Sequence, residues 1–137
     1  MSIEVTFPGG KRVDARVGPF VVATDQPATA GGAGSAPAPF DLFLASIATC
    51  AGIYALGFCQ ARGLSTDGLS LSMSADKDAS GLPTRFVLDL GLPAGFPEKY
   101  RGAIAKAVEG CKVKKTIAAQ PAFEVTVRAL EGSCAVE

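Results

Sequence analysis

The feature that most restricts the fold of this chain is a long segment without charge. Residues 42–59 contain no Asp, Glu, Lys or Arg. The ends of this segment carry helix signals, because Pro39 suits a first helical position, while Arg62 and Gly63 supply a basic last turn and a C-terminal glycine. A helix this apolar has no face suited to water. We therefore predict one helix over residues 39–63 that is buried nearly all round.

Such a helix can lie in a membrane or in a protein core. Its uncharged stretch just reaches the usual length of a membrane span. However, it contains Ser46, Thr49 and two glycines, and it has no flanking basic cluster. The segments on both sides of it alternate like the strands of a soluble domain. We therefore expect the core of a soluble protein and no membrane contact.

Length and charge narrow the class of protein further. A chain of 137 residues is long enough for one well-buried core, so we predict a single domain over residues 1–137. Acidic and basic residues balance at 13 each, which leaves no basic surface for nucleic acid. The N-terminus lacks the basic region and apolar run of a signal peptide, and this predicts a cytoplasmic location.

The rest of the chain predicts an α+β fold. Segments that alternate apolar and polar residues, separated by Gly- and Pro-containing turns, are expected to be strands. They cover residues 2–7, 12–17, 20–24, 69–75, 84–92 and 123–130. Two shorter helices are expected over residues 98–110 and 112–119, on either side of the break at Gly110. Residues 25–38 are rich in Gly and Pro and match no phosphate-binding motif, so they predict a plain connecting loop.

The resulting order is βββ-α-ββ-αα-β, in which sheet must wrap the long apolar helix. One chain of this size cannot cover that helix on every side. We therefore predict a homodimer in which the partner supplies the missing cover.

The chain has four cysteines, which are its strongest candidates for reactive side chains. Two of them lie at positions where a chemical role is plausible. Cys50 lies in the middle of the apolar helix, and Cys111 directly follows the break at Gly110. Cys59 is about 180° around the helix from Cys50, so it faces elsewhere. Cys134 lies in a C-terminal tail that we expect to be frayed. A free cysteine is often only a small buried hydrophobe, and this inert alternative stays open for Cys50.

The chain contains no histidine, which limits what can activate a thiol. A Cys-His nucleophile pair and a mixed Cys/His zinc site cannot be built from this chain alone. A thiolate metal site would need four converging cysteines, so we predict no metal. Cys111 lies near a helix start and is followed by Lys112, Lys114 and Lys115, a run that is typical of a solvated face but also favours a thiolate.

Two motifs resemble those of the OsmC/Ohr family. The run PFDLFLASIATC, which ends at Cys50, is similar to the family's P-x-E-L-L-x-A-x-x-x-x-C helix. The run CKVKKTI, which begins at Cys111, is similar to its second signature, C-P-V-S-K-x-L. The order of elements matches as well, so the resemblance covers nearly the whole chain.

The resemblance implies a fold, a partner and an activity. Members of the family are intertwined homodimers with two cysteines at the subunit interface, and characterised members reduce organic hydroperoxides. Cys50 would then be the peroxidatic cysteine and Cys111 the resolving one. No bound cofactor is implied, because an external dithiol such as a lipoyl group, or a small thiol, serves as reductant. Apolar side chains on the same helix would form a pocket for a fatty hydroperoxide: Phe40, Phe43, Ile47 and Tyr54.

The chain also departs from the family pattern, and this keeps a second function open. Family peroxidases hold the cysteine with a glutamate ten residues upstream and an arginine from the N-terminal strands. Phe40 takes the glutamate position here, and Asp41 is predicted to face away from Cys50. Arg12 and Arg16 are the candidate arginines. These departures resemble the YhfA-like branch of the family, and they allow a non-peroxidatic dimer that binds an apolar, fatty acyl-like ligand or senses redox state.

Overall fold

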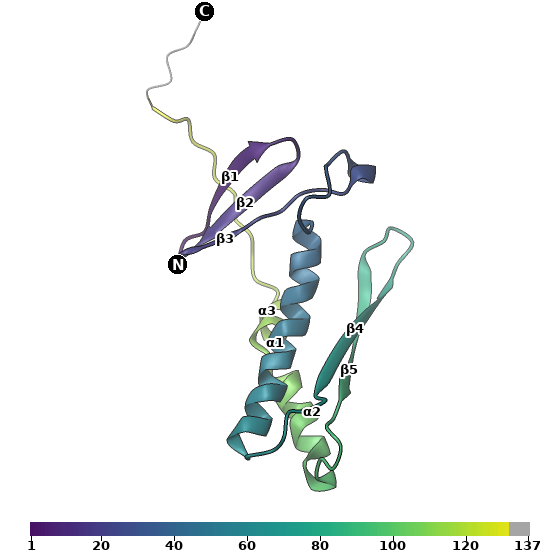
Figure 1. Ribbon diagram of the computed structural model, residues 1–137. Coiled ribbons are helices and arrows are strands. Elements are labelled where there is room, and N and C mark those ends of the chain that lie inside the picture. Colours follow the sequence, from purple (N-terminus) through teal and green to yellow (C-terminus); the bar gives the residue numbers. More distant parts are fainter. Residues whose placement is uncertain (132–137) are drawn as a thin grey trace, which may run out of the picture.

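A long helix forms the axis of the fold. The computed structural model describes residues 1–131 of the chain, and in it helix α1 spans Pro39–Ala61 (Figure 1). The helix starts as predicted, with Pro39 in its first turn, and the Asp41 carboxylate accepts a hydrogen bond from the Ala38 N–H at 3.1 Å. It ends at Ala61, and the predicted C-terminal glycine, Gly63, follows with a φ of 63° that a glycine adopts at no steric cost.

Two separate antiparallel sheets accompany this helix. The first has the order β1-β2-β3, and the second is a hairpin of β4 and β5. The strands are β1 Glu4–Gly9, β2 Arg12–Val17, β3 Phe20–Val22, β4 Ser70–Lys77 and β5 Pro83–Gly91. Figure 1 shows the first sheet beyond the N-terminal end of α1 and the hairpin alongside α1. The five strands predicted before residue 93 are thus confirmed, with β3 shorter than expected.

The helical part after β5 also follows the predicted order. A 3-10 turn, η2 Glu98–Tyr100, leads into α2 Arg101–Glu109, and α3 Lys112–Ala118 follows the break at Gly110. Gly110 caps α2 through hydrogen bonds from its N–H to the carbonyls of Lys106 and Ala107, both at 3.1 Å. The class, α+β, and the order βββ-α-ββ-αα are therefore as the sequence predicted.

The core lies on one side of α1. Ala51, Ala55 and Cys59 are at most 1% exposed, and they pack with Ile104 and Val108 of α2. Leucines of the hairpin cover this cluster from the other side: Leu71, Leu88 and Leu90. The small side chains on α1 let α2 and the hairpin approach closely, and this spacing builds the core.

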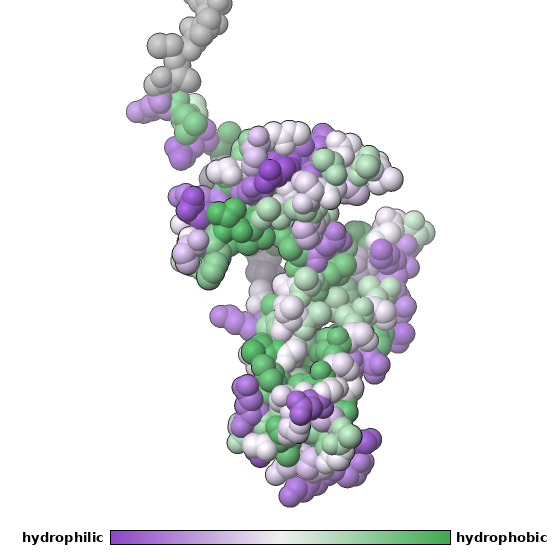
Figure 2. Space-filling view, viewed as in Figure 1, coloured by the Kyte–Doolittle hydropathy of each residue, from purple (hydrophilic) through white to green (hydrophobic). Residues whose placement is uncertain are grey.

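Within the single chain α1 is only partly buried, as expected for a chain too short to cover this helix on every side. Only about a quarter of its apolar stretch, 28%, is buried. Ile53 is 57% exposed and Phe40 is 45% exposed. The sheets do not wrap the helix, because the first sheet lies past its end and the hairpin covers one side. Figure 2 shows apolar residues, in green, exposed among polar ones on the surface of the single chain. By length and composition alone α1 could cross a membrane, a test that core helices also pass.

The last predicted strand, residues 123–130, is not formed in the structure. This segment pairs with no strand within residues 1–131, and Phe123, Val125 and Val127 are between 86% and 94% exposed. Its alternation of apolar and polar residues suits a strand with one buried face. However, a strand forms only where a neighbour accepts its hydrogen bonds, and the segment lies beside no such neighbour within residues 1–131.

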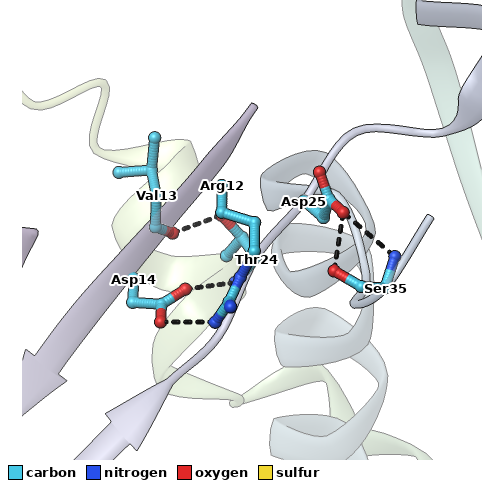
Figure 3. A network of polar contacts seen from close by, with 6 residues as sticks. All are labelled: Arg12, Val13, Asp14, Thr24, Asp25 and Ser35. Atoms are coloured by element: carbon cyan, nitrogen blue, oxygen red, sulfur yellow. Dashed lines mark hydrogen bonds and ion pairs between the residues drawn. The ribbon is translucent and has the colours of Figure 1, made fainter. Parts of the chain in front are cut away.

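A buried carboxylate anchors the loop between β3 and α1. Asp25 is 1% exposed, and it accepts hydrogen bonds from the Ser35 hydroxyl at 2.6 Å and the Ser35 N–H at 3.0 Å (Figure 3). It also accepts one from the Gln26 N–H at 2.7 Å. These donors, the Ser35 hydroxyl foremost, lower the pKa of Asp25 to about 2. Gly32 has no room for a side chain, since a Cβ would lie 1.9 Å from the Gln26 carbonyl oxygen. The predicted connector is therefore a tightly held loop.

We expect Asp25→Asn to lower the midpoint of thermal unfolding at pH 7 by several degrees. The native pKa of Asp25 lies below its unfolded value of 3.8, so its stabilisation is present above that value and is lost as the pH falls from about 4 to about 2. Unfolding followed by circular dichroism at pH 7, 4 and 2 measures this difference. Asp67→Asn, at an exposed turn, is the control. Equal pH dependence in the native chain and in Asp25→Asn would contradict the assignment.

Candidate active site

The structure brings the two singled-out cysteines together. Cys50 is half-buried on α1, and Cys111 is 0% exposed at the position that caps the start of α3. α3 packs against α1, and the Cys111 side chain lies near enough to Cys50 to lower its pKa. The Lys115 N–H donates to the Cys111 carbonyl at 3.0 Å, which fixes Cys111 to the first turn of α3.

The surroundings of Cys50 favour its thiolate. The hydrogen bond with the Cys111 side chain is the largest of the causes that lower the pKa of Cys50. The backbone N–H groups of Val113 and Lys112 and the positive charge of Lys114 act in the same direction, while burial opposes them. The thiolate is the nucleophilic form of cysteine, so these groups favour the form of Cys50 that can attack an electrophile.

The other two cysteines lie apart from this pair. Cys59 is 0% exposed and belongs to the core cluster with α2, so it faces away from Cys50 as helical geometry predicts. Cys134 lies outside the described residues. Among residues 1–131, no three Cys, Asp or Glu side chains converge in a way that could hold a metal ion.

The three residues predicted to support Cys50 are Asp41, Arg12 and Arg16. None of them is among the groups that shift the pKa of Cys50 within this chain. Asp41 caps the start of α1 with its carboxylate. Arg12 Nη2 donates to the Asp14 carboxylate at 2.8 Å (Figure 3), and Arg16 is exposed on β2. The groups that shift the pKa of Cys50 belong instead to α3 and its capping residue.

The four apolar residues predicted to form a pocket do not line a common cavity in the described part of the chain. Ile47 is 1% exposed and packed away. Phe40 contacts Phe43, with ring centroids 5.7 Å apart. Phe43 lines an open groove, whereas Tyr54 lines a different hollow beside Phe58. The prediction placed them together because they share one helix, but an all-apolar helix has several faces.

The groove at Phe43 adds residues that sequence reasoning missed. It has a volume of about 490 Å³ and lies between α1, α3 and the segment after α3. Its remaining lining residues are Thr116, Ile117, Gln120, Pro121 and Phe123. The groove shares α3 with Cys111, so an apolar molecule in it would lie on the same helix as the cysteine pair. The apolar residues Ile117 and Phe123 were the only sequence signal for it.

Fold and site together define an α+β protein with two neighbouring cysteines, of which Cys50 has a lowered pKa. The family model for OsmC-like proteins matches residues 32–126, which include both cysteines and more than half of the chain. The chain belongs to the OsmC-like family, as its two motifs predicted. A comparison with curated proteins found no match.

Solved structures of the same fold agree with this assignment. A protein of Psychrobacter arcticus described as an osmotic stress induced and detoxification response protein has a TM-score of 0.66 at 20% identity, over 85% of this chain and 87% of that one. An organic hydroperoxide resistance protein OsmC of Legionella pneumophila, also described as a redox protein, has a TM-score of 0.55 at 22% identity, over 85% and 87%. An organic hydroperoxide resistance protein of Vibrio cholerae, with captopril in one of its active sites, has a TM-score of 0.51 at 18% identity, over 85% and 84%. At these identities the likeness concerns the fold.

Proposed function

We propose that this protein is a thiol-dependent peroxidase that reduces organic hydroperoxides. The observation that supports the proposal is the packing of α3 on α1, which brings the buried thiol of Cys111 near Cys50, whose pKa is lowered. A reactive thiolate with a second thiol nearby is the arrangement that peroxide reduction by cysteine requires. The names of the Legionella and Vibrio proteins are consistent with this activity.

The chemistry balances with the groups in this site. The Cys50 thiolate attacks the distal peroxide oxygen, the O–O bond breaks, and the alkoxide takes up a proton and leaves as an alcohol. Cys50 is then a sulfenic acid. The Cys111 thiol attacks the sulfenic sulfur, and a disulfide and water form. An external dithiol such as a lipoyl group reduces the disulfide by exchange and is itself oxidised to a disulfide. No bound cofactor is needed, and a reducing cytoplasm suits free cysteines.

The substrate class follows from the groove beside α3. Its walls are largely apolar, and its volume lies in the range of small-molecule sites. An alkyl or aryl chain would bury surface there, whereas hydrogen peroxide has none to bury. We therefore propose an organic hydroperoxide in preference to hydrogen peroxide.

Purified protein supplied with dihydrolipoamide is expected to consume cumene hydroperoxide at least about tenfold more efficiently than hydrogen peroxide. Peroxide loss over time, with and without the dithiol, measures this. Ile117→Ser in the groove should raise the KM for cumene hydroperoxide and leave the reaction with hydrogen peroxide unchanged. No turnover of either peroxide, with Cys50 unreactive toward mild oxidant, would contradict the proposal.

A second candidate function is the binding of an apolar ligand without turnover. Two observations favour it: the open groove at Phe43, and Phe40 at the position where family peroxidases have an acid. In this case the cysteines would serve packing or redox sensing. An inert Cys50 together with a fatty acyl molecule that co-purifies, identified by native mass spectrometry, would support this function.

We also propose that the protein acts as a homodimer joined through residues 123–130. The segment is extended and unpaired, and its apolar side chains are almost fully exposed. The first sheet has a free edge at β1, and its register places Val5, Ala15 and Val22 on one face. An added strand with one apolar side would extend this face.

Charge and alternation specify how a partner's segment would pair with β1. An antiparallel register that places Arg128 opposite Glu4 also places Val127 opposite Val5 and Val125 opposite Phe7. Each charged side chain would then lie opposite a side chain of the other sign, and each apolar side chain would lie opposite an apolar one. A second copy therefore supplies the neighbour that the segment lacks within its own chain.

A further inference from the structure

The helix that begins after Cys111 carries an excess of positive charge. Residues 106–120 contain four lysines and one acidic residue, Glu109, although the whole chain has no net charge. The three ion pairs found within residues 1–131 all use arginine side chains, so no lysine of α3 is in an ion pair in that part of the chain. Lys112 and Lys115 are exposed. These two lysines therefore form a basic surface of α3 that faces solvent.

The basic surface of α3 lies next to the cysteine pair. Lys112 directly follows Cys111 in the chain, so their Cα atoms are about 3.8 Å apart. The Lys115 N–H donates to the Cys111 carbonyl at 3.0 Å, so Lys115 lies one helical turn from Cys111. The backbone of both lysines is thus within the Debye length of about 8 Å that applies at physiological ionic strength. α3 in turn packs against α1, which carries Cys50.

The reactant that must reach this position in the proposed cycle is the dithiol that reduces the disulfide. Cys111 is 0% exposed and Cys50 is half-buried, so the accessible sulfur is that of Cys50. The dithiol attacks as a thiolate, and Cys111 leaves as a thiolate. Positive charge beside the two sulfurs therefore favours an anion on either side of the exchange. A dithiol with a further negative charge would be attracted to the basic surface of α3 as well.

We propose that the basic surface of α3 binds the reductant, and that this reductant is an anionic dithiol with a carboxylate near its thiols. The inference rests on the proposed peroxidase function, because it names the reductant of that cycle. One thiolate of the reductant attacks the Cys50 sulfur, a mixed disulfide forms, and the S–S bond to Cys111 breaks. The Cys111 thiolate takes up a proton. The second thiolate of the reductant then displaces Cys50 from the mixed disulfide, and the reductant is oxidised to a cyclic disulfide.

The test follows reduction of the disulfide directly and needs no peroxide. The disulfide is formed with diamide, peptide mass spectrometry confirms that it joins Cys50 and Cys111, and the appearance of free thiols measures its reduction. Dihydrolipoate and dihydrolipoamide are the probes, because they are the same dithiol with a carboxylate and with a neutral amide. At low salt dihydrolipoate is expected to react about threefold to tenfold faster. Salt at about 0.5 M should remove this advantage through screening.

Two double variants locate the charge that is responsible. Lys112→Glu/Lys115→Glu reverses the charge of the basic surface and should make dihydrolipoamide the faster reductant. Lys77→Glu/Lys99→Glu makes the same change in net charge at exposed positions on β4 and η2 and is the matched control. The control should retain the native preference for dihydrolipoate. Circular dichroism of both variants checks that the fold is kept.

Several results would overturn the proposal. They are equal rates for the two dithiols, a preference that survives in Lys112→Glu/Lys115→Glu, an equal loss in the control, or no disulfide between Cys50 and Cys111 after diamide. A protein that shows the expected preference and yet consumes no hydroperoxide would keep the basic surface of α3 as a reductant site and lose the peroxidase function. The two proposals can therefore fail separately.

Discussion

Cys50→Ser is expected to abolish the consumption of organic hydroperoxide, with a loss of at least about a thousandfold. A serine hydroxyl does not ionise near neutral pH, so the groups around it have no anion to stabilise and the O–O bond has no nucleophile. The measurement is dithiol-dependent peroxide loss in the native chain and in the variant. Substantial turnover in Cys50→Ser would refute the role of Cys50.

Two companion variants show whether the cysteine pair acts as proposed. Cys111→Ser keeps a hydrogen-bonding side chain but cannot form the disulfide, so one equivalent of alcohol should form and a sulfenic acid should persist on Cys50, where dimedone traps it. Cys59→Ala is the control for a lost thiol, because Cys59 is 0% exposed in the core and away from the pair. It should keep the activity and lose about 1 kcal/mol of stability.

The second large effect is expected for Val125→Asp/Val127→Asp. Both side chains are at least 86% exposed in the single chain, so the change costs little there. In the proposed dimer each valine is covered by the partner, and losing that cover costs about 1.5–3 kcal/mol per side chain. The dissociation constant of the dimer should therefore rise by at least about a hundredfold, as measured by light scattering over a range of protein concentrations.

The polar positions of the same segment provide the control for this variant. Glu124→Gln/Thr126→Ser changes two residues on the other side of the alternation and should leave the dimer intact. The charge pair gives an independent check, because Arg128→Glu should weaken the dimer and Glu4→Arg in the same chain should restore part of the loss. A native chain that is monomeric at all concentrations would rule the dimer out.

The parts of the fold that were predictable from sequence depend on local signals. Pro39 and Gly63 mark the ends of α1, and the alternating segments around residues 78–83 specify the second hairpin. The segment at 123–130 carries the same kind of alternation, yet it is unpaired. Alternation shows which side of a strand is apolar, but the neighbour that completes the strand is a property of the assembly.

The site was predictable only in part for a related reason. The two cysteine motifs identified the pair, and the structure places Cys111 near Cys50. This proximity depends on the packing of α3 against α1, which spacing along the chain does not show. Asp41 caps its own helix, and a pattern of residue types cannot distinguish a capping carboxylate from a catalytic one.

Only one side of α1 is buried within a single chain, and this affects how the stability of the fold can depend on protein concentration. One chain buries 28% of the apolar stretch of this helix, so a large share of its hydrophobic stabilisation is available only when another surface covers the rest. Any surface that binds the folded chain and not the unfolded one shifts the equilibrium by mass action. If the proposed homodimer supplies that surface, the thermal stability of this protein should rise with its concentration and fall on dilution.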